Sequence, residues 1–243
     1  MIEFKNLVKK FGTRTVLNGL SLNIREGEII FVLGTSGTGK SVLLKNIVGL
    51  MTPDEGEIWI DGQEVSKFTE DQYLPIRKKC GMVFQHPALF DSLTIFENVA
   101  FSLRRHYQLP ETEITEKVKT ALKLVHLHGV ESKKPAQISY GMQKRVSLAR
   151  TIALQPKILL FDEPTTGLDP VTTTAVNQLI QDLSRELKTT SVVVSHDMNC
   201  ALSIADRIVV LDKGQIVALG TPDELKRSEI PLVRDFLAEA LTV

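Results

Sequence analysis

The chain has 243 residues, of which 43% are hydrophobic and 24% charged; this ordinary globular composition excludes a disordered or fibrous protein. Its 29 basic and 29 acidic residues give a net charge of zero, which argues against binding nucleic acid or anionic lipid chiefly through bulk charge. Neither of the two cysteines lies in a CxxC pair, so we expect a reduced cytosolic protein without a zinc or disulfide framework.

The N-terminal part of the chain predicts short strands around one helix. We expect strands at 2–7 and 16–24, joined by a turn at Gly12. An apolar run at 28–33 ends at Gly34 and leads through a glycine-rich loop to a helix at 41–50. A hairpin follows at 56–64, with Asp61-Gly62 as its turn, and a further strand at 81–84.

Residues 92–153 show helical rather than strand periodicity and predict an inserted helical subdomain. Strands resume at 158–161, 191–195, 207–211 and 215–219, with helices at 171–187 and 197–204. This alternation predicts a mostly parallel sheet covered by helices. No apolar run approaches the ~18–20 residues that cross a bilayer, and no secretory signal opens the chain, so we expect any membrane role to come through a partner.

The C-terminal segment predicts a packed amphipathic helix. Pro231 suits a first helical turn. A helix this short is marginal in water, so its apolar stripe must be covered by the chain's own core or by a partner. The stripe consists of Val233, Phe236, Leu237, Ala240 and Leu241.

The loop at 34–41 has the pattern of a phosphate-binding loop. Its glycines let backbone N–H groups turn toward phosphate oxygens, and the following helix adds the positive end of its dipole. Lys40 would reach the β- and γ-phosphates of a nucleotide, and the Ser41 hydroxyl would ligate Mg²⁺. A plain glycine-rich turn would need neither the strand before it nor the helix after it, and both are predicted. The residues that fit G-x-x-x-x-G-K-[ST] are Gly34, Thr35, Ser36, Gly37, Thr38, Gly39, Lys40 and Ser41.

The apolar run at 158–161 ends in two carboxylates, Asp162 and Glu163. Such a strand places its final carboxylate at the carboxyl edge of a parallel sheet, where ligands collect. Asp162 could hold Mg²⁺, directly or through water, and Glu163 could polarise an attacking water. A solvated acidic turn is the alternative for this segment alone, but the loop at 34–41 favours the catalytic interpretation.

The segment 138–150 reads I-S-Y-G-M-Q-K-R-V-S-L-A-R and resembles the L-S-G-G-Q signature of ABC ATPases with the helix that follows it. Other positions match the same family in the expected order: Gln85 in its Q-loop, 164–169 in its D-loop, and His196 as its switch histidine. Phe11 stands where the family has an adenine-stacking aromatic residue. On these motifs the chain is identified as a member of the ABC ATPases over its whole length.

This resemblance implies an α/β fold: a P-loop NTPase ABC cassette with a mixed-sheet core, an N-terminal antiparallel β subdomain and an inserted α-helical subdomain. We expect a single ABC ATPase domain over 1–243, with its core at 1–91 and 154–243 and its helical subdomain at about 92–153. The resemblance also implies ATP hydrolysis with Mg²⁺, the ATP being sandwiched in a head-to-tail homodimer. The implied catalytic residues are Glu163, His196 and Lys40. The implied metal ligands are Ser41, Gln85 and Asp162. Nucleotide contacts are implied for Phe11, the loop 34–41, Gln85, Ser139, Gly141 and Asp169.

Two signature positions depart from the family pattern. Tyr140 replaces the usual first glycine, and Met142 replaces the usual glutamine. Ser139 and Gly141, which contact phosphate most closely in the family, are kept. We therefore expect ATPase activity to survive.

The segment 86–101, H-P-A-L-F-D-S-L-T-I-F-E-N-V-A-F, is similar to a run in the Mla/Mce-associated lipid-transport ATPases, as are Met142 and the segment 41–45. This resemblance implies phospholipid transport between membranes, at the cytoplasmic face of the inner (plasma) membrane. The implied partners are integral-membrane permease subunits, an Mce-domain lipid-binding protein and an accessory cytoplasmic subunit, with no nucleic acid. Two alternatives stay open: an importer of a polar solute, and a soluble ABC ATPase acting on DNA or ribosomes. The latter class usually carries a coiled-coil or zinc insertion or a second cassette, none of which the sequence contains.

Overall fold

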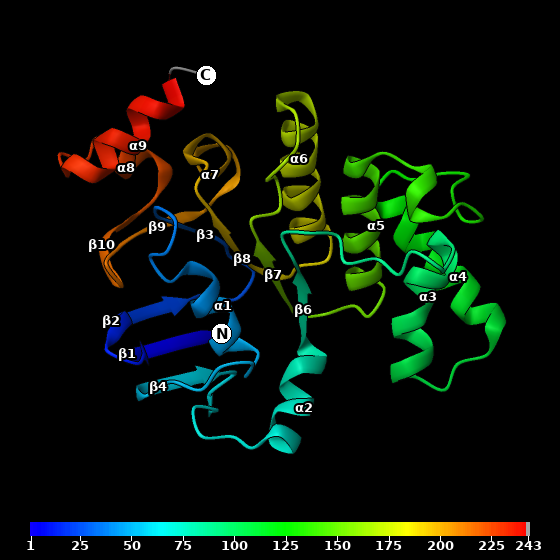
Figure 1. Ribbon diagram of the computed structural model, residues 1–243, viewed down its shortest axis with the longest axis horizontal. Helices are drawn as coiled ribbons and strands as arrows, with labels where there is room; N and C mark the ends of the chain where they lie inside the picture. The colour runs from blue at the N-terminus through cyan, green and yellow to red at the C-terminus, as the bar shows by residue number, and fades with distance from the viewer. Residues whose placement is uncertain (242–243) are drawn as a thin grey trace.

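The computed structural model describes residues 1–241, with the side chain of Leu241 left out, and contains two β-sheets (Figure 1). The smaller sheet is antiparallel, in the order β2-β1-β4-β5. The larger has the order β10-β9-β3-β8-β7-β6 and is parallel except for β10. The strands of the smaller sheet are β1 (Ile2–Phe11), β2 (Arg14–Ile24), β4 (Glu55–Ile60) and β5 (Gln63–Glu64). Those of the larger are β3 (Ile29–Leu33), β6 (Cys80–Val83), β7 (Ile158–Asp162), β8 (Thr190–Ser195), β9 (Arg207–Asp212) and β10 (Gln215–Gly220).

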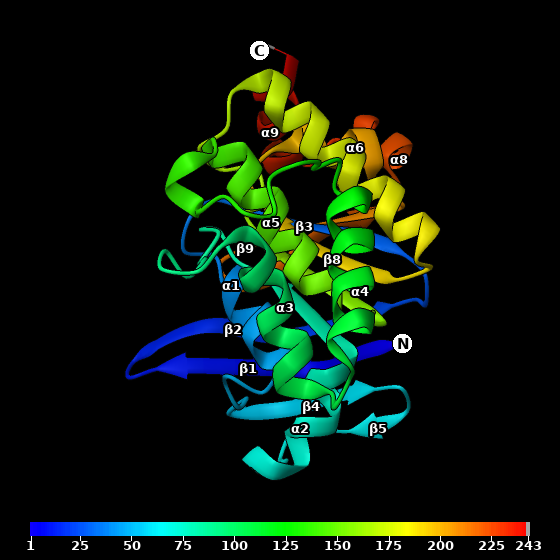
Figure 2. The ribbon, with the colours of Figure 1, turned by 90° about the vertical axis from the view of Figure 1, so that its right-hand side faces the viewer.

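Helices lie around both sheets, with α2 against β6 and α6 against α7. One group, α3, α4 and α5, packs together at one end of the molecule (Figures 1 and 2). Helix α1 lies between the two sheets, and α7, α8 and α9 pack beside one another near β9 and β10. The bounds are α1 (Lys40–Ile47), α2 (Glu70–Lys79), α3 (Ile95–His106), α4 (Glu111–Leu124), the 3₁₀ turn η1 (Pro135–Gln137), α5 (Tyr140–Ile152), α6 (Pro170–Glu186), α7 (Met198–Ile204), α8 (Pro222–Lys226) and α9 (Pro231–Leu241).

The inner strands β3, β7, β8 and β9 of the six-stranded sheet are buried on both faces, which explains why they read as continuous apolar runs. In β3, Phe31 belongs to the core that the helices from α3 to α9 form on one face of the sheet. Ile30 and Val32 belong to the core on the other face, with α1 and the antiparallel sheet. Alternate residues of β7 and β8 divide in the same way. Each strand therefore contributes to two separate cores, and the sheet is the rigid layer between them.

The predicted fold class is confirmed, with an antiparallel sheet beside a mixed sheet and a helical segment after β6. Two short helices, α2 and α8, were not predicted from the sequence. The predicted C-terminal helix is present as α9, and its Val233 and Phe236 are buried in the core with α7 residues. The Leu241 side chain, the end of the predicted stripe, lies outside the described residues. No helix within residues 1–241 combines the length and apolar character that a bilayer crossing requires.

Both cysteines are unpaired thiols that the fold shields. Burial raises the pKa of Cys80 to about 12. Burial, followed by the hydrogen bond to Asp197, raises the pKa of Cys200 to about 12.

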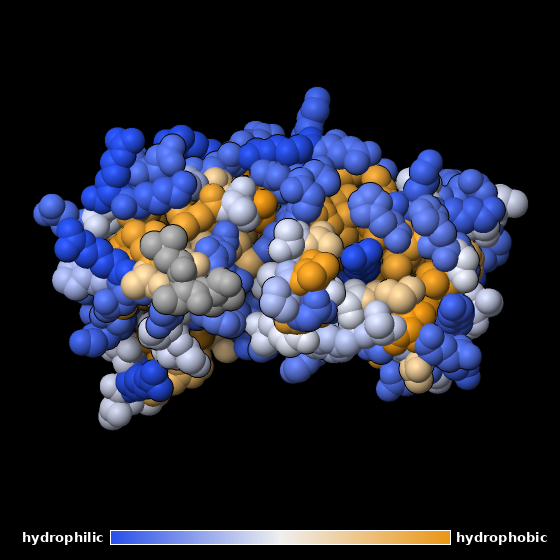
Figure 3. Space-filling model, turned by 90° about the horizontal axis from the view of Figure 1, so that it is seen from above, coloured by the Kyte–Doolittle hydropathy of each residue, from blue (hydrophilic) through white to orange (hydrophobic). Residues whose placement is uncertain are grey.

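Figure 3, a view onto the top of Figure 1, shows a mostly hydrophilic face with hydrophobic side chains visible in its hollows.

Candidate functional site

Four neighbouring strands deliver the candidate residues to one edge of the larger sheet. The strands β3, β8, β7 and β6 are parallel and adjacent, and they end within one residue of one another in register: Leu33 pairs with Ser195, and Val83 pairs with Phe161, the residue before the end of β7. Because parallel strands end at the same edge, the segments that follow them converge there. The segments after β3, β7 and β8 begin with Gly34, Glu163 and His196, and Gln85 is the second residue after β6.

The loop 34–41 depends on glycine at two positions. A Cβ at Gly34 would lie 2.6 Å from the backbone oxygen of Leu211 and 2.7 Å from Thr38 Oγ1, so a side chain does not fit. Gly39 has φ of +103°, where side chains are rarely tolerated, and it immediately precedes Lys40, the first residue of α1. The backbone can therefore curl tightly at the N-terminus of a helix, the geometry that binds phosphate.

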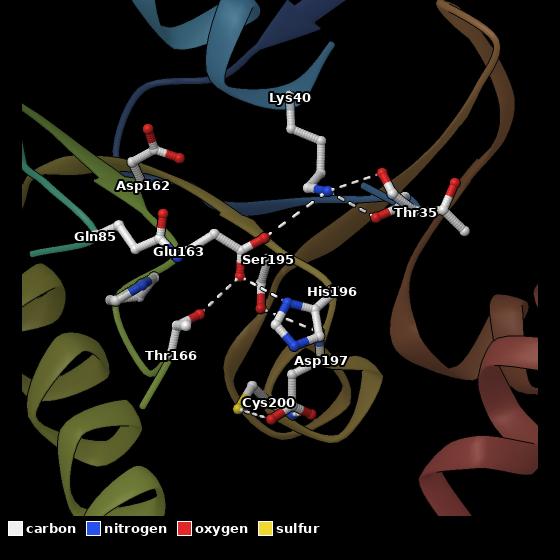
Figure 4. Close-up of polar contacts among 12 residues, drawn as sticks. Thr35, Lys40, Gln85, Asp162, Glu163, Thr166, Ser195, His196, Asp197 and Cys200 are labelled. Carbon is white, nitrogen blue, oxygen red and sulfur yellow. Dashed lines mark hydrogen bonds and ion pairs between the residues drawn. The ribbon is translucent and has the colours of Figure 1, made fainter. Parts of the chain in front are cut away.

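Lys40 is buried and directed along this loop (Figure 4). Its Nζ donates to the backbone oxygens of Gly34 at 2.7 Å and Thr35 at 3.1 Å, and lies 3.8 Å from Glu163 Oε1. Burial lowers the pKa of Lys40, and the charges of Glu163 and Asp162 oppose that shift. The ammonium group is thus held by carbonyls of its own loop, beside the acidic end of β7.

Glu163 is fixed by three side chains from three segments (Figure 4). Its Oε2 lies 2.8 Å from His196 Nδ1 and accepts a hydrogen bond of 3.2 Å from Thr166 Oγ1, while Oε1 faces Lys40. Its φ of +50° is unusual for a residue with a side chain. Since a non-glycine residue keeps such a conformation only where its surroundings hold it, the position of this carboxylate is determined by tertiary structure.

The predicted metal ligands supply oxygen atoms alone. Ser41 Oγ donates to Asp162 Oδ1 at 2.7 Å, which joins the start of α1 to the end of β7. Gln85 lines the same cavity as Ser41. Hydroxyl, carboxylate and amide oxygens are hard donors, and Mg²⁺ favours this kind of ligand and is commonly held through a carboxylate and phosphates. The residues present therefore fit the predicted ion.

One cavity of about 750 Å³ collects most of the predicted nucleotide contacts. Phe11, which is 47% exposed, stands on its wall, as its predicted contact with a base requires. Three other predicted residues are hydrogen-bonded to residues that line the cavity: Lys40 donates to Gly34, Thr38 to Thr35, and Ser41 to Asp162. Sequence reasoning missed six further lining residues, Arg14, Val16, Val42, Thr166, Phe236 and Glu239. Of the predicted residues, the cavity is lined by Phe11, Thr35, Ser36, Gly37, Gly39, Lys40, Ser41, Gln85, Glu163 and His196.

Ser139, Gly141 and Asp169 lie apart from this cavity. They line a second cavity of about 340 Å³ at the start of α5, together with Arg145 and other residues. Ser139 Oγ accepts a hydrogen bond from the Met142 backbone N–H at 3.3 Å and so caps α5. Hydrogen bonds from Thr172 lower the pKa of Asp169, which caps α6. Within one chain, the structure therefore divides the predicted nucleotide contacts between two separate cavities.

On this fold, three features together define an ATP-binding cassette. They are a phosphate-binding loop at a helix start, an acidic strand end with a neighbouring histidine, and a separate signature-type helix start. The chain belongs to the ABC transporter family as an ATP-binding subunit, and it is thus an ABC-type ATPase, because the family model described as ABC transporter matches residues 17–166.

Individual relatives agree with that membership. The chain is 41% identical over 237 residues to the intermembrane phospholipid transport system ATP-binding protein MlaF of Haemophilus influenzae, covering 98% of this chain and 90% of that protein. It is 42% identical over 236 residues to the probable ribonucleotide transport ATP-binding protein mkl of Mycobacterium leprae, covering 97% of this chain and 68% of that protein. A solved dimeric structure of the ATP-binding cassette MJ0796, in a post-hydrolysis state with ADP and Pi, has a TM-score of 0.83 and 36% identity, covering 91% of this chain and 99% of that one.

Proposed function

We propose that this chain hydrolyses ATP to drive phospholipid transport between membranes, with Glu163 as the group that polarises the attacking water. The observation that carries the hydrolytic assignment is the carboxylate of Glu163, held 3.8 Å from Lys40 Nζ at the mouth of the phosphate loop. A fixed carboxylate beside a fixed cation is poised to take a proton from water while phosphate charge is neutralised.

The other roles follow from the cavity. Lys40 exchanges its loop carbonyls for β- and γ-phosphate oxygens when ATP binds. Because His196 Nδ1 is hydrogen-bonded to Glu163, the other ring nitrogen, Nε2, would contact the γ-phosphate. Phe11 stacks on the adenine from the exposed wall.

Ser41, Gln85 and Asp162 would hold Mg²⁺. When bound, the ion would neutralise charge on the β- and γ-phosphate oxygens. The Ser41–Asp162 hydrogen bond positions these two oxygens before any ligand arrives.

We further propose that two copies of the chain assemble head to tail around ATP. The signature half-site of Ser139, Gly141 and Asp169 is separate from the cavity of Lys40 within one chain. A second copy would supply that half-site to the triphosphate. The MJ0796 cassette, which is similar along most of this chain, is described as dimeric.

The phospholipid assignment rests on MlaF, whose length the chain nearly spans. We propose a single ATPase domain, with the helical subdomain at about 92–153, peripheral to the cytoplasmic face of the inner membrane. Its partners would be permease subunits, an Mce-domain lipid-binding protein and an accessory cytoplasmic subunit.

An importer of a polar solute is the second candidate, because mkl, at similar identity, is named for ribonucleotide transport. These two candidate functions can be distinguished by a transport assay. The chain is purified together with its membrane subunits and reconstituted in liposomes, and ATP-dependent transfer of labelled phospholipid to acceptor vesicles is measured. Transfer that disappears with Glu163→Gln supports lipid transport. Hydrolysis without lipid transfer, stimulated instead by a solute-binding protein, supports the importer.

A further inference from the structure

Lys144 is a buried cation that the mechanism above does not use. It lies in the second turn of α5, and the residue is 6% exposed. Its Nζ donates to the backbone oxygen of Gln85 at 2.9 Å and to that of Pro164, also at 2.9 Å. It does not line the cavity of Lys40, so it is placed to act on the residues there rather than on a nucleotide.

The two carbonyls belong to the two segments that need positioning. Gln85 follows β6 and is a proposed metal ligand, while Pro164 follows Glu163 directly. Glu163 sits in the left-handed region with φ of +50°, so a neighbouring anchor is required to hold it there. Burying an ammonium group is costly unless its donors are satisfied. Two charge-assisted hydrogen bonds therefore tie Gln85 and Pro164, the residue next to Glu163, to the same atom.

The same helix makes two further attachments to the segment after Gln85. Arg150 Nη1 donates to the Ala88 backbone oxygen at 2.8 Å, and its Nη2 to that of Pro87 at 3.2 Å. The Tyr140 hydroxyl lies 3.3 Å from His86 Nδ1, and the Tyr140 ring is 5.5 Å from Lys144 Nζ. Residues 85–88 are thus held by α5 at each successive position, and α5 begins at the signature segment.

We infer that Lys144 is a positioning residue, which sets the Gln85 segment and the Glu163 segment in one rigid unit with the signature helix. A displacement of the signature half-site then moves both segments together. The inference rests on the proposed roles of Gln85 and Glu163. It makes Tyr140, one of the two departures from the family pattern, a secondary contact of the same unit.

The test compares Lys144→Met, which keeps an unbranched chain that lacks only the terminal ammonium group and so removes the donors, with Lys144→Arg, which keeps charge and donors. Lys123→Met, at an exposed position on α4, is the matched control. Each protein is assayed with any co-purifying membrane subunits for kcat, KM and the stoichiometry of ATP binding. Hydrogen exchange is followed in two peptides, 84–90 and 29–33.

We expect Lys144→Met to lower kcat tenfold or more, since small misplacements of reacting groups have large effects. ATP-binding stoichiometry should be unchanged, exchange should accelerate in 84–90 and not in 29–33, and Lys144→Arg should recover much of kcat. A kcat within twofold of wild type overturns the inference. Equal acceleration in both peptides without recovery by Lys144→Arg also overturns it, because Lys144 would then act only on overall stability. If wild type and Lys123→Met both fail to hydrolyse ATP, the proposed function fails, whereas the exchange difference still tests the rigid unit.

Discussion

Replacing Phe236 with aspartate tests whether α9 is an intrinsic part of this fold. The Phe236 side chain is 6% exposed and belongs to the core that includes the α7 residues Met198, Ala201 and Ile204. Helix α9 is further tied to α7 by Asn199 Nδ2, which donates to the Ala240 backbone oxygen at 2.9 Å. The buried part of the predicted apolar stripe of α9 therefore packs against this chain's own core.

The expected loss combines lost apolar contact with an unpaired buried charge. Removing a buried phenylalanine costs ~3–5 kcal/mol. Because α9 is terminal, it can undock and limit the loss, so we expect about 3 kcal/mol. At roughly 2–4 °C per kcal/mol for a chain of this size, Tm should fall by about 6–12 °C.

The assay is thermal unfolding of the isolated chain, followed by circular dichroism, with complex yield measured in parallel. Phe236→Leu should cost less than about 1.5 kcal/mol because it stays apolar. Asp235→Ala, on the exposed side of the same helix, should stay within about 0.5 kcal/mol of wild type. An unchanged Tm for Phe236→Asp with a reduced complex yield would refute docking on the chain's own core and indicate docking on a partner.

Three further substitutions address the site. Lys40→Ala should abolish ATP binding or turnover, because backbone donors alone do not offset the charge of the β- and γ-phosphates; hydrolysis retained in the purified complex would remove the assignment of the loop. Glu163→Gln should bind ATP and stall in a closed dimer, with a rate lowered by ~10²–10⁴; a fast variant, seen by phosphate release, would transfer the role to His196 or to solvent. Tyr140→Gly should keep the rate within about tenfold, or ~1.4 kcal/mol in the barrier, since Ser139, Gly141 and both Lys144 hydrogen bonds are kept; a complete loss would show a specific contact of Tyr140 across the dimer.

Local sequence patterns predicted which residues gather at the sheet edge better than they predicted the contacts that hold those residues in place. The loop 34–41 and the carboxylates at the end of β7 were predictable because each lies at the end of an apolar run, and parallel strands bring their ends together. By contrast, Lys144 reads as an ordinary polar residue of a helix, because its burial depends on loops 20 and 59 residues away. Phe236 was predicted to be buried, but its place on the cavity wall follows from how α9 packs, which periodicity does not encode.

The missed helix α2 illustrates a different limit. Pro75 inside the segment and its strongly polar composition hid the helical pattern. A signal was present nevertheless, because Thr69 and Gln72 form a capping box, with the Thr69 N–H donating to Gln72 Oε1 at 2.8 Å. The equivalent signal before α8 is Thr221 with Glu224.

The shielding of the two thiols has a practical consequence for labelling chemistry. Alkylating and maleimide reagents attack the thiolate, and a pKa of about 12 leaves Cys80 and Cys200 almost wholly protonated near neutral pH. A cysteine introduced at an exposed position, such as Val171 at the start of α6, would therefore react far faster than either native thiol. Spectroscopic probes or cross-linkers can thus be attached to the otherwise unaltered chain, and distances between two copies measured, without first removing its natural cysteines.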